Sequence, residues 1–457
     1  MVKIRKWISD NSFFVFILSL FTCGSLIYVS IASSNVPIMD YWRYADALIV
    51  KCYSGVVSFI DIYSNNGVHR SAFQLWLYLL NVKMLHWNTQ VSMYLAIFVN
   101  CISSILIYKI IDNFTMNKIS GLWAKIVCTI IVFSFIPYEL ITQEFAFAAA
   151  VCTLAFVGLS YLVCEFLNQV SSVYEKKLWL VSLFILFVVD IIGGAFAVGL
   201  VISLLIVLIF DFVKKKCRGD KIFIWNYVIL IGSIILGLFL YLHGLNVVAG
   251  GTTGSMNGVL KSLVQGAIII CGTSLVGEYA GMTVIYIIGI ITLLIHFVLF
   301  CSYIFFKLYD KTYIPVVFYL YYGAFYGMLF LGRTGNGVGY LCAPRYAKEA
   351  VYVLVADIIV IILLIEHFRS KKKLLQLMCL LGVIVTLLFS GCIESANIRE
   401  WKMAPYRKVY CDNLIGIMSD IDNYADEDLG AFQADSPELV RRVVEKMKRY
   451  ELGIFNK

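Results

Sequence analysis

The chain has 457 residues, of which 61% are hydrophobic and 14% are charged, and its formal net charge is +8. Soluble domains are about 45–50% apolar and about 25% charged. A soluble fold of this length cannot bury so much apolar surface, so the composition excludes an ordinary soluble protein. The basic residues stand in short runs between apolar segments, which is typical of membrane topology signals and indicates no nucleic-acid partner. Tyr (29) nearly matches Phe (32), which fits a protein with many helix ends at membrane interfaces.

Apolar runs of about twenty residues, the length that crosses a hydrocarbon core about 30 Å thick, recur along the chain. By the positive-inside rule, the basic N-terminus and the runs Lys214–Lys216 and Lys371–Lys373 belong in the cytoplasm. We therefore expect an all-α polytopic membrane protein of about 11 (11–13) transmembrane helices, with the N-terminus inside and the C-terminus outside. The predicted spans are Ser12–Ala32, Gln90–Ile110, Gly121–Pro137, Ala146–Cys164, Leu178–Ile192, Ala195–Phe212, Phe223–His243, Met282–Phe305, Tyr313–Leu331, Ala347–Glu366 and Leu374–Ser390.

Two further apolar stretches do not fit this topology. Ser71–Trp87 is short and interrupted by polar residues, so we expect an amphipathic helix at the membrane interface. Gly258–Gly277 contains Lys261 and Gln265, and we expect a re-entrant or interfacial segment there.

The chain divides into two predicted regions. Residues 1–391 form a transmembrane domain, whose first external loop covers residues 33–89. Residues 392–457 form an external tail that is rich in Asp and Glu and ends in a helical pattern over Pro437–Tyr450.

Polar residues at the outer face of an apolar bundle are candidate functional groups, because burying them is costly without a purpose. Asp40 lies just past the first helix, where Pro37 breaks the chain, and Asp46 follows one to two helical turns later. Asp40 could cap a helix that begins near Tyr41, since Asp favours that position, or it could be a catalytic carboxylate. Position alone does not separate these two roles.

Two more external segments carry candidate residues. His69 and Arg70 precede the predicted interfacial helix. His can shuttle protons or bind a metal and Arg binds phosphate, although either could equally anchor the chain at the interface. Glu139 and Glu144 lie in a loop too short to need two carboxylates for solubility. One of them could face Asp40 as a second acid, a metal ligand or a sugar contact, and the alternative is a solvated turn.

A Gly-rich loop over residues 332–339 carries Arg333 and leads to Arg345 and Tyr346. Backbone N–H groups of such a loop can bind phosphate, with Arg as the counter-charge; the alternative is a flexible loop with interfacial arginines. The loop lacks the Gly-Lys-Ser/Thr of an ATP-binding P-loop and is predicted to face outward.

The order of these motifs resembles that of the lipid-dependent membrane glycosyltransferases of the GT-C type. In that superfamily the first external loop carries an essential acidic residue near its start and two juxtamembrane helices before the second span. Asp40 matches the acidic position, and Ser71–Trp87 matches the second juxtamembrane helix. The resemblance therefore implies a GT-C-like bundle with juxtamembrane helices in its first external loop.

The similarity is greatest to uncharacterised bacterial members of the superfamily and covers most of the chain through short motifs. The matching residues are Pro37, Asp40-Tyr41-Trp42, His69-Arg70, Glu139, Gly332-Arg333, Arg345-Tyr346 and the turn from Leu452 to Phe455. Val68 stands where the family pattern has a Glu. The sequence requires no cofactor, and the need for a divalent cation stays open.

The resemblance implies transfer of a sugar from a polyprenyl-phosphate donor to a cell-surface glycan or lipid-linked acceptor, at the outer face of a bacterial cytoplasmic membrane. Asp40 would be the general base of an inverting displacement. Arg333, Arg345 and Tyr346 would bind the donor phosphate. The residues that would position the acceptor or the donor are Asp46, His69, Arg70, Glu139 and Glu144.

Two other functions are compatible with a polytopic protein. A transporter or flippase of a lipid-linked glycan would show functional charges at mid-membrane, and few such charges are evident in the sequence. A membrane-embedded glycan polymerase or ligase would place its largest external loop late in the chain, whereas here the large loop comes first.

Overall fold

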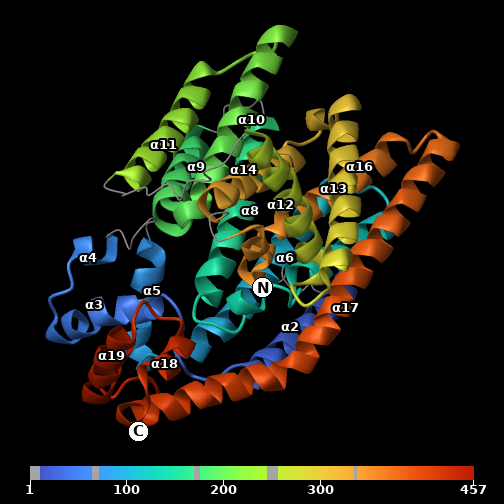
Figure 1. The fold of residues 1–457 in the computed structure, drawn as a ribbon. Coiled ribbons are helices and arrows are strands. Elements are labelled where there is room, and N and C mark those ends of the chain that lie inside the picture. The colour runs from blue at the N-terminus through green and yellow to red at the C-terminus, as the bar shows by residue number, and fades with distance from the viewer. Residues whose placement is uncertain (1–10, 64–70, 169–174, 244–255, 334–336, 457) are drawn as a thin grey trace.

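The computed structural model describes residues 11–63, 71–168, 175–243, 256–333 and 337–456. These residues form helices and contain no strand. Ten of the helices are long and apolar enough to cross a membrane. The chain is therefore a multi-pass membrane protein with an all-α fold, as its composition predicts (Figure 1).

The ten long helices form one bundle around a large apolar core. They are α2 (Ser12–Ala32), α6 (Thr89–Asp112), α8 (Ala146–Asn168), α10 (Ala197–Arg218), α11 (Ile224–Leu242), α12 (Met256–Val276), α13 (Met282–Phe305), α14 (Ile314–Arg333), α16 (Ala350–His367) with the short α15 (Pro344–Ala347) before it, and α17 (Lys372–Ser419).

Two of the predicted spans form shorter helices. α7 (Lys118–Val132) has 15 residues, and α9 (Glu175–Phe187) has 13 and is extended by a π-helical turn, η3 (Val188–Ile192). α7 packs against α6 and α16, whereas α9 packs against α11 and leaves Trp179, Leu180 and Leu183 exposed. Their positions agree with the predicted spans, but both helices are shorter than the ten long ones.

Of the two alternatives expected for Gly258–Gly277, the packing of α12 within the bundle excludes the interfacial one, and the re-entrant one stays a prediction. The helix runs antiparallel to α13, and two glycines bring the backbones together. A Cβ atom on Gly272 would overlap the carbonyl oxygen of Ile285, and one on Gly289 would overlap that of Ile268. Small residues allow such close approach between membrane helices. α12 is also among the helices able to cross a membrane by length and hydropathy.

Of the segments predicted to be cytoplasmic, those around residues 116, 214–218, 306–310 and 366–368 meet at one end of the bundle, here called the basic end. The contacts that join them are the ion pairs Lys214–Asp310 (3.3 Å) and Arg218–Asp310 (2.8 Å), the packed rings of Phe306 and Phe368, and the hydrogen bond from Met116 N–H to Glu366 (3.1 Å). This clustering agrees with the positive-inside interpretation of the sequence.

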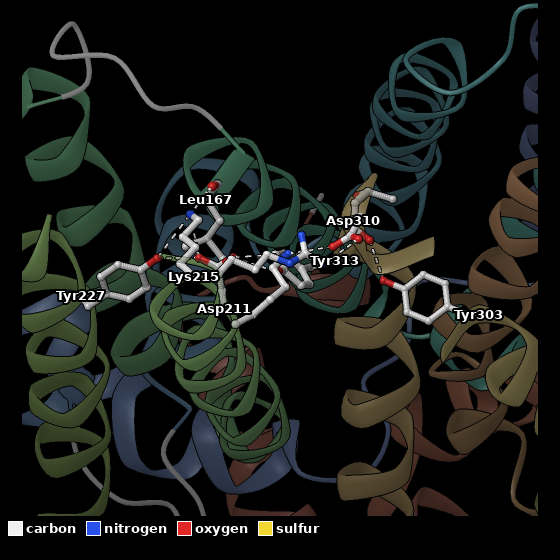
Figure 2. Close-up of polar contacts among 10 residues, drawn as sticks. Leu167, Asp211, Lys215, Tyr227, Tyr303, Asp310 and Tyr313 are labelled. Atoms are coloured by element: carbon white, nitrogen blue, oxygen red, sulfur yellow. Dashed lines mark hydrogen bonds and ion pairs between the residues drawn. The ribbon is translucent and has the colours of Figure 1, made fainter. Parts of the chain in front are cut away.

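A buried carboxylate ties four helices together at the basic end. Asp211 on α10 is 1% exposed. It accepts hydrogen bonds from the hydroxyls of Tyr227 at 2.5 Å and Tyr313 at 2.7 Å, and it pairs with Lys215 at 2.9 Å. Figure 2 shows these side chains converging, with Lys215 also donating to the carbonyl oxygen of Leu167 on α8 at 2.7 Å. The cluster is fully partnered, which is what a buried charge requires.

α17 extends well beyond the predicted last span, Leu374–Ser390. The helix does not stop near Ser390 but continues without a break for 48 residues, with Pro405 inside it. At 1.5 Å per residue it is about 70 Å long, more than twice the hydrocarbon thickness. In Figure 1 it runs from the basic end of the bundle to the lower left, where it meets α18 and α19. The tail is therefore a direct extension of the bundle.

The first loop and the tail share one apolar core, separate from that of the bundle. The loop supplies α3 (Tyr41–Ser54), α4 (Phe59–Tyr63) and α5 (Ala72–Leu85), and the tail supplies the end of α17, α18 (Asp426–Leu429) and α19 (Pro437–Arg449). We call this assembly the loop–tail unit, and the end of the bundle that carries it the loop–tail end. The predicted division at residue 391 thus separates two segments that pack against each other.

α5 has the properties expected of a helix at a membrane surface. Its 14 residues are too few to cross a bilayer. One side is buried in the loop–tail unit, while Trp76, Leu80 and Met84 leave an apolar surface exposed. The C-terminal turn of the chain secures its end, since Gly453 N–H donates to His86 O at 2.7 Å.

Replacing Gly272 by Ala should separate α12 from α13. The added methyl overlaps the backbone of Ile285, and such overpacking typically costs about 1–3 kcal/mol of unfolding free energy. Thermal unfolding of the purified protein in detergent measures the effect. Gly232→Ala on α11 is the control, because its Cβ meets nothing within 4 Å. Equal unfolding temperatures for the two variants would contradict the packing described for α12.

Candidate functional site

Asp40 lies at the start of α3, directly after a turn that the tail fixes. Met39 has a left-handed backbone with φ of 63°, and its N–H donates to Phe432 O at 3.1 Å. Asp40 occupies the N-cap position of α3, as the cap interpretation predicts, but its side chain forms no capping hydrogen bond. Its carboxylate is 44% exposed and lies 3.8 Å from the guanidinium of Arg43. Asp40 is therefore an accessible carboxylate beside a positive charge.

Asp46 holds the tail against α3. Its carboxylate pairs with Lys446 at 2.6 Å and with Arg442 at 3.1 Å, both on α19. Burial alone would raise the pKa of Asp46, but hydrogen bonds from Arg442 and Lys446 hold it below its ordinary value. Arg43 adds a bidentate pair with Asp435, with both N–O distances 2.8 Å. The carboxylate of Asp46 is thus occupied in packing α19 on α3.

Glu139 and Arg345 are brought together although they are 206 positions apart. Glu139 belongs to a 3-10 turn, η1 (Tyr138–Leu140), and Arg345 to α15. Arg345 Nη1 lies 2.9 Å from Glu139 Oε2, and Nη2 donates to the Tyr340 hydroxyl at 2.7 Å. The guanidinium also faces the ring of Tyr346, 5.3 Å from its centroid. A predicted carboxylate and a predicted phosphate-binding arginine therefore neutralise each other here.

Arg333 differs from Arg345 in being exposed at the end of α14. Within the described residues, no carboxylate lies within 4 Å of its side chain, and it is close enough to Tyr346 to interact electrostatically. Its charge is thus open to an anion from solvent. His69 and Arg70 lie outside the described residues.

Glu144 is buried in the seam between the bundle and the loop–tail unit. It is 5% exposed, and both of its carboxylate oxygens accept from Trp87 Nε1, at 3.1 and 3.0 Å. Its backbone carbonyl accepts from the Tyr41 hydroxyl at 3.5 Å, and the ring of Phe145 packs on Tyr41. Burial raises the pKa of Glu144 to about 8, although the Trp87 hydrogen bond partly opposes this.

A second set of polar residues at η1 was not found in the sequence. The Tyr138 hydroxyl donates to Glu278 at 2.6 Å, and the Arg407 guanidinium stacks on the Tyr138 ring, 3.2 Å from its centroid. Arg407 also pairs at 2.6 Å with Glu400, which lies two helical turns earlier on α17. No local signal indicates this cluster, because it depends on α17 continuing past Ser390.

The candidate residues thus form two groups on either side of the Glu144 seam. Asp40 and Asp46 belong to α3 and the tail, whereas Glu139, Arg345 and Tyr346 lie around η1 at the loop–tail end of the bundle. An accessible carboxylate on one side and cationic groups on the other are the elements of an acid–base and anion-binding site.

In the described part of the chain, no three His, Cys, Asp or Glu side chains are grouped closely enough to hold a metal ion. Comparison of the chain with protein-family models, with curated proteins and with solved structures finds no match in any of the three.

The burial of Glu144 predicts a pH-dependent contribution to stability. The folded protein binds this proton more tightly than the unfolded chain, so the contribution is complete below the ordinary pKa of 4.5 and is lost as the pH rises to about 8. Glu144→Gln keeps an acceptor for Trp87 but cannot ionise. Its unfolding temperature should therefore exceed that of wild type at about pH 9. The two should converge near about pH 5, and parallel pH profiles would exclude an ionising Glu144.

Proposed function

We propose that this protein transfers a sugar from a polyprenyl-phosphate donor to a cell-surface glycan or lipid-linked acceptor, with Asp40 as general base. The observation that carries the proposal is the state of Asp40 among the predicted acidic residues. Asp46 and Glu139 are held in close ion pairs, and Glu144 is buried. Asp40 alone of these four is substantially exposed and free of a close ion pair, as a base that must meet an acceptor hydroxyl requires.

The arrangement around Asp40 supports a GT-C-like enzyme at the outer face of a bacterial cytoplasmic membrane. Three short helices, α3, α4 and α5, stand between the first two long helices, and Asp40 directly precedes the first of them. The basic end of the bundle would face the cytoplasm by the positive-inside rule, which places the loop–tail unit outside. An enzyme of this design receives its lipid donor laterally and its acceptor from the aqueous side.

The proposed reaction is a single displacement at the anomeric carbon. Asp40 takes the proton of the acceptor hydroxyl as its oxygen forms the new glycosidic bond, and the bond from the anomeric carbon to the phosphate oxygen breaks. The polyprenyl phosphate leaves with the electron pair, and the anomeric configuration is inverted. Arg333 offers an open positive charge for that phosphate, whereas Arg345 must first exchange its bond to Glu139.

One observation favours the alternative of a transporter or flippase. His296 and Asp357 form a buried pair, with Nδ1 and Oδ2 separated by 2.6 Å, near the middle of α13 and of the α15–α16 span. The Tyr319 hydroxyl donates to the second Asp357 oxygen at 2.5 Å. The bundle therefore holds two ionisable side chains, His296 and Asp357, that the sequence analysis did not select as candidates. They are satisfied by one another, which suits a structural role at least as well as transport.

Turnover with a panel of polyprenyl-phosphate sugars tests the transferase. Wild type should transfer or hydrolyse at least one donor, and Asp40→Asn should lower the rate at least about 100-fold, within the range expected for loss of a general base. Asp61→Asn is the matched control, since Asp61 belongs to the same loop and is bonded to Lys51 and Ser58. Full activity in a folded Asp40→Asn protein would exclude the base assignment. Inactivity of wild type on every donor, together with movement of a lipid-linked glycan across proteoliposomes, would establish the transporter instead.

A further inference from the structure

Lys348 is a buried lysine that forms no ion pair within 4 Å among the described residues, although the buried carboxylate of Glu349 attracts it from farther away. It follows α15 with helical backbone angles and is 7% exposed. Its ammonium donates to Asn100 Oδ1 at 3.3 Å, and no described carboxylate lies within 4 Å of it. The neighbouring Glu349 directs its carboxylate to the Tyr321 hydroxyl on α14. Two of the three ammonium donors are therefore left without a protein acceptor in the contacts seen.

A second buried lysine, Lys125, has its charge neutralised by an ion pair, as is usual for a buried ammonium. Lys125 on α7 is 5% exposed, and its ammonium pairs with Asp112 at 2.6 Å. A lone charge inside a membrane protein is costly, and such residues commonly mark a binding site or an ion path. The difference between Lys125 and Lys348 thus requires an explanation.

Two cavities adjoin Lys348, of about 10 and about 20 Å³. Val132, Ser134, Pro137 and Lys348 line both of them, and Asn100 lines the larger. Each has room for about one water molecule. The Ser134 hydroxyl and the Lys348 ammonium can donate hydrogen bonds into this space. A phosphate group is larger than one water molecule and enters only if the surrounding segments move apart.

The cavities lie beside the Glu139–Arg345 pair. Pro137, which lines both cavities, directly precedes η1 and Glu139. Arg345 and Lys348 are three residues apart on helical backbone, so their side chains share a face. The partly exposed Arg345 and the buried Lys348 are thus two cations on one face of the same short segment.

We propose that Lys348 binds a phosphate group, with Arg345 as its outer partner. The proposal deepens the transferase proposal and rests on it only in taking this phosphate to be that of the polyprenyl carrier. Because the cavities are water-sized, binding displaces water and moves η1 outward from α15. Glu139 then gives up its pair with Arg345, which turns toward the phosphate.

The test is a binding measurement that needs no turnover. Thermal unfolding of the full chain in detergent is followed with polyprenyl phosphate, with polyprenol and with inorganic phosphate. Polyprenyl phosphate should stabilise wild type and polyprenol should not. Lys348→Met should weaken binding by about 10- to 100-fold, the range expected for loss of a charge-assisted hydrogen bond. Without ligand, Lys348→Met should unfold at or above the wild-type temperature, because it removes an unpaired buried charge.

Two further variants separate binding from folding. Lys125→Met strips Asp112 of its partner, so it should lower the unfolding temperature and leave the polyprenyl-phosphate shift unchanged. Lys348→Arg keeps the charge and should retain most of the shift, and it serves as the test if Lys348→Met does not fold. An unchanged shift in Lys348→Met, or a loss of stability without ligand equal to that of Lys125→Met, would overturn the proposal. Stabilisation by inorganic phosphate alone, lost in Lys348→Met, would support the anion site and overturn its assignment to the lipid. Because no sugar is present, binding without any transferase activity would leave Lys348 assigned and remove only the proposed reaction.

Discussion

The structure depends on one constraint, which is that a polar group inside a lipid-embedded bundle must find its partner within the protein. Tyrosine hydroxyls meet much of this need. The buried carboxylates that accept from tyrosine are Asp211, bonded to Tyr227 and Tyr313, Asp357, bonded to Tyr319, and Glu349, bonded to Tyr321. From the sequence, the high tyrosine content is explained by helix ends at membrane interfaces. The structure adds a second use, because tyrosine hydroxyls also donate hydrogen bonds to buried carboxylates. Lys348 differs from these carboxylates because its ammonium has only the hydrogen bond to Asn100 among the contacts seen.

The elements that the sequence predicts best are those decided by apolar length alone. Most spans begin and end within a few residues of their predicted limits, because lipid exposure requires continuous hydropathy. The interfacial alternative for α12 was wrong because Gln265, which resembles a polar interruption in the sequence, is bonded to the Tyr286 hydroxyl on α13 in the fold. α17 was cut short because hydropathy falls after Ser390, and a helix need not end where its lipid contact ends.

The candidate site was predictable in its parts but not in its pairings. Asp40, Glu139 and Arg345 can be selected from position and residue type, yet the contact between the last two spans 206 positions and depends on how the whole bundle packs. Arg407 gave no signal, because its neighbours in sequence suggest an ordinary charged tail. Lys348 was equally hidden, since only the fold shows that a lysine next to Arg345 turns inward and loses contact with water.

Because α17 is continuous, it fixes both the orientation of the loop–tail unit relative to the bundle and the distance between them. Trp401 packs on Tyr28 of α2, and Leu414 on the same helix lies in the core of the loop–tail unit. Each residue of a helix adds about 100° of turn and 1.5 Å of rise. A single insertion between these two positions would therefore swing the unit by more than a quarter turn and drive its apolar face away from α3. Seven inserted residues would return the unit to within about 20° of its original orientation but would shift it about 10 Å along the helix axis. Natural variation in chain length should thus fall in the loops and spare this segment of α17.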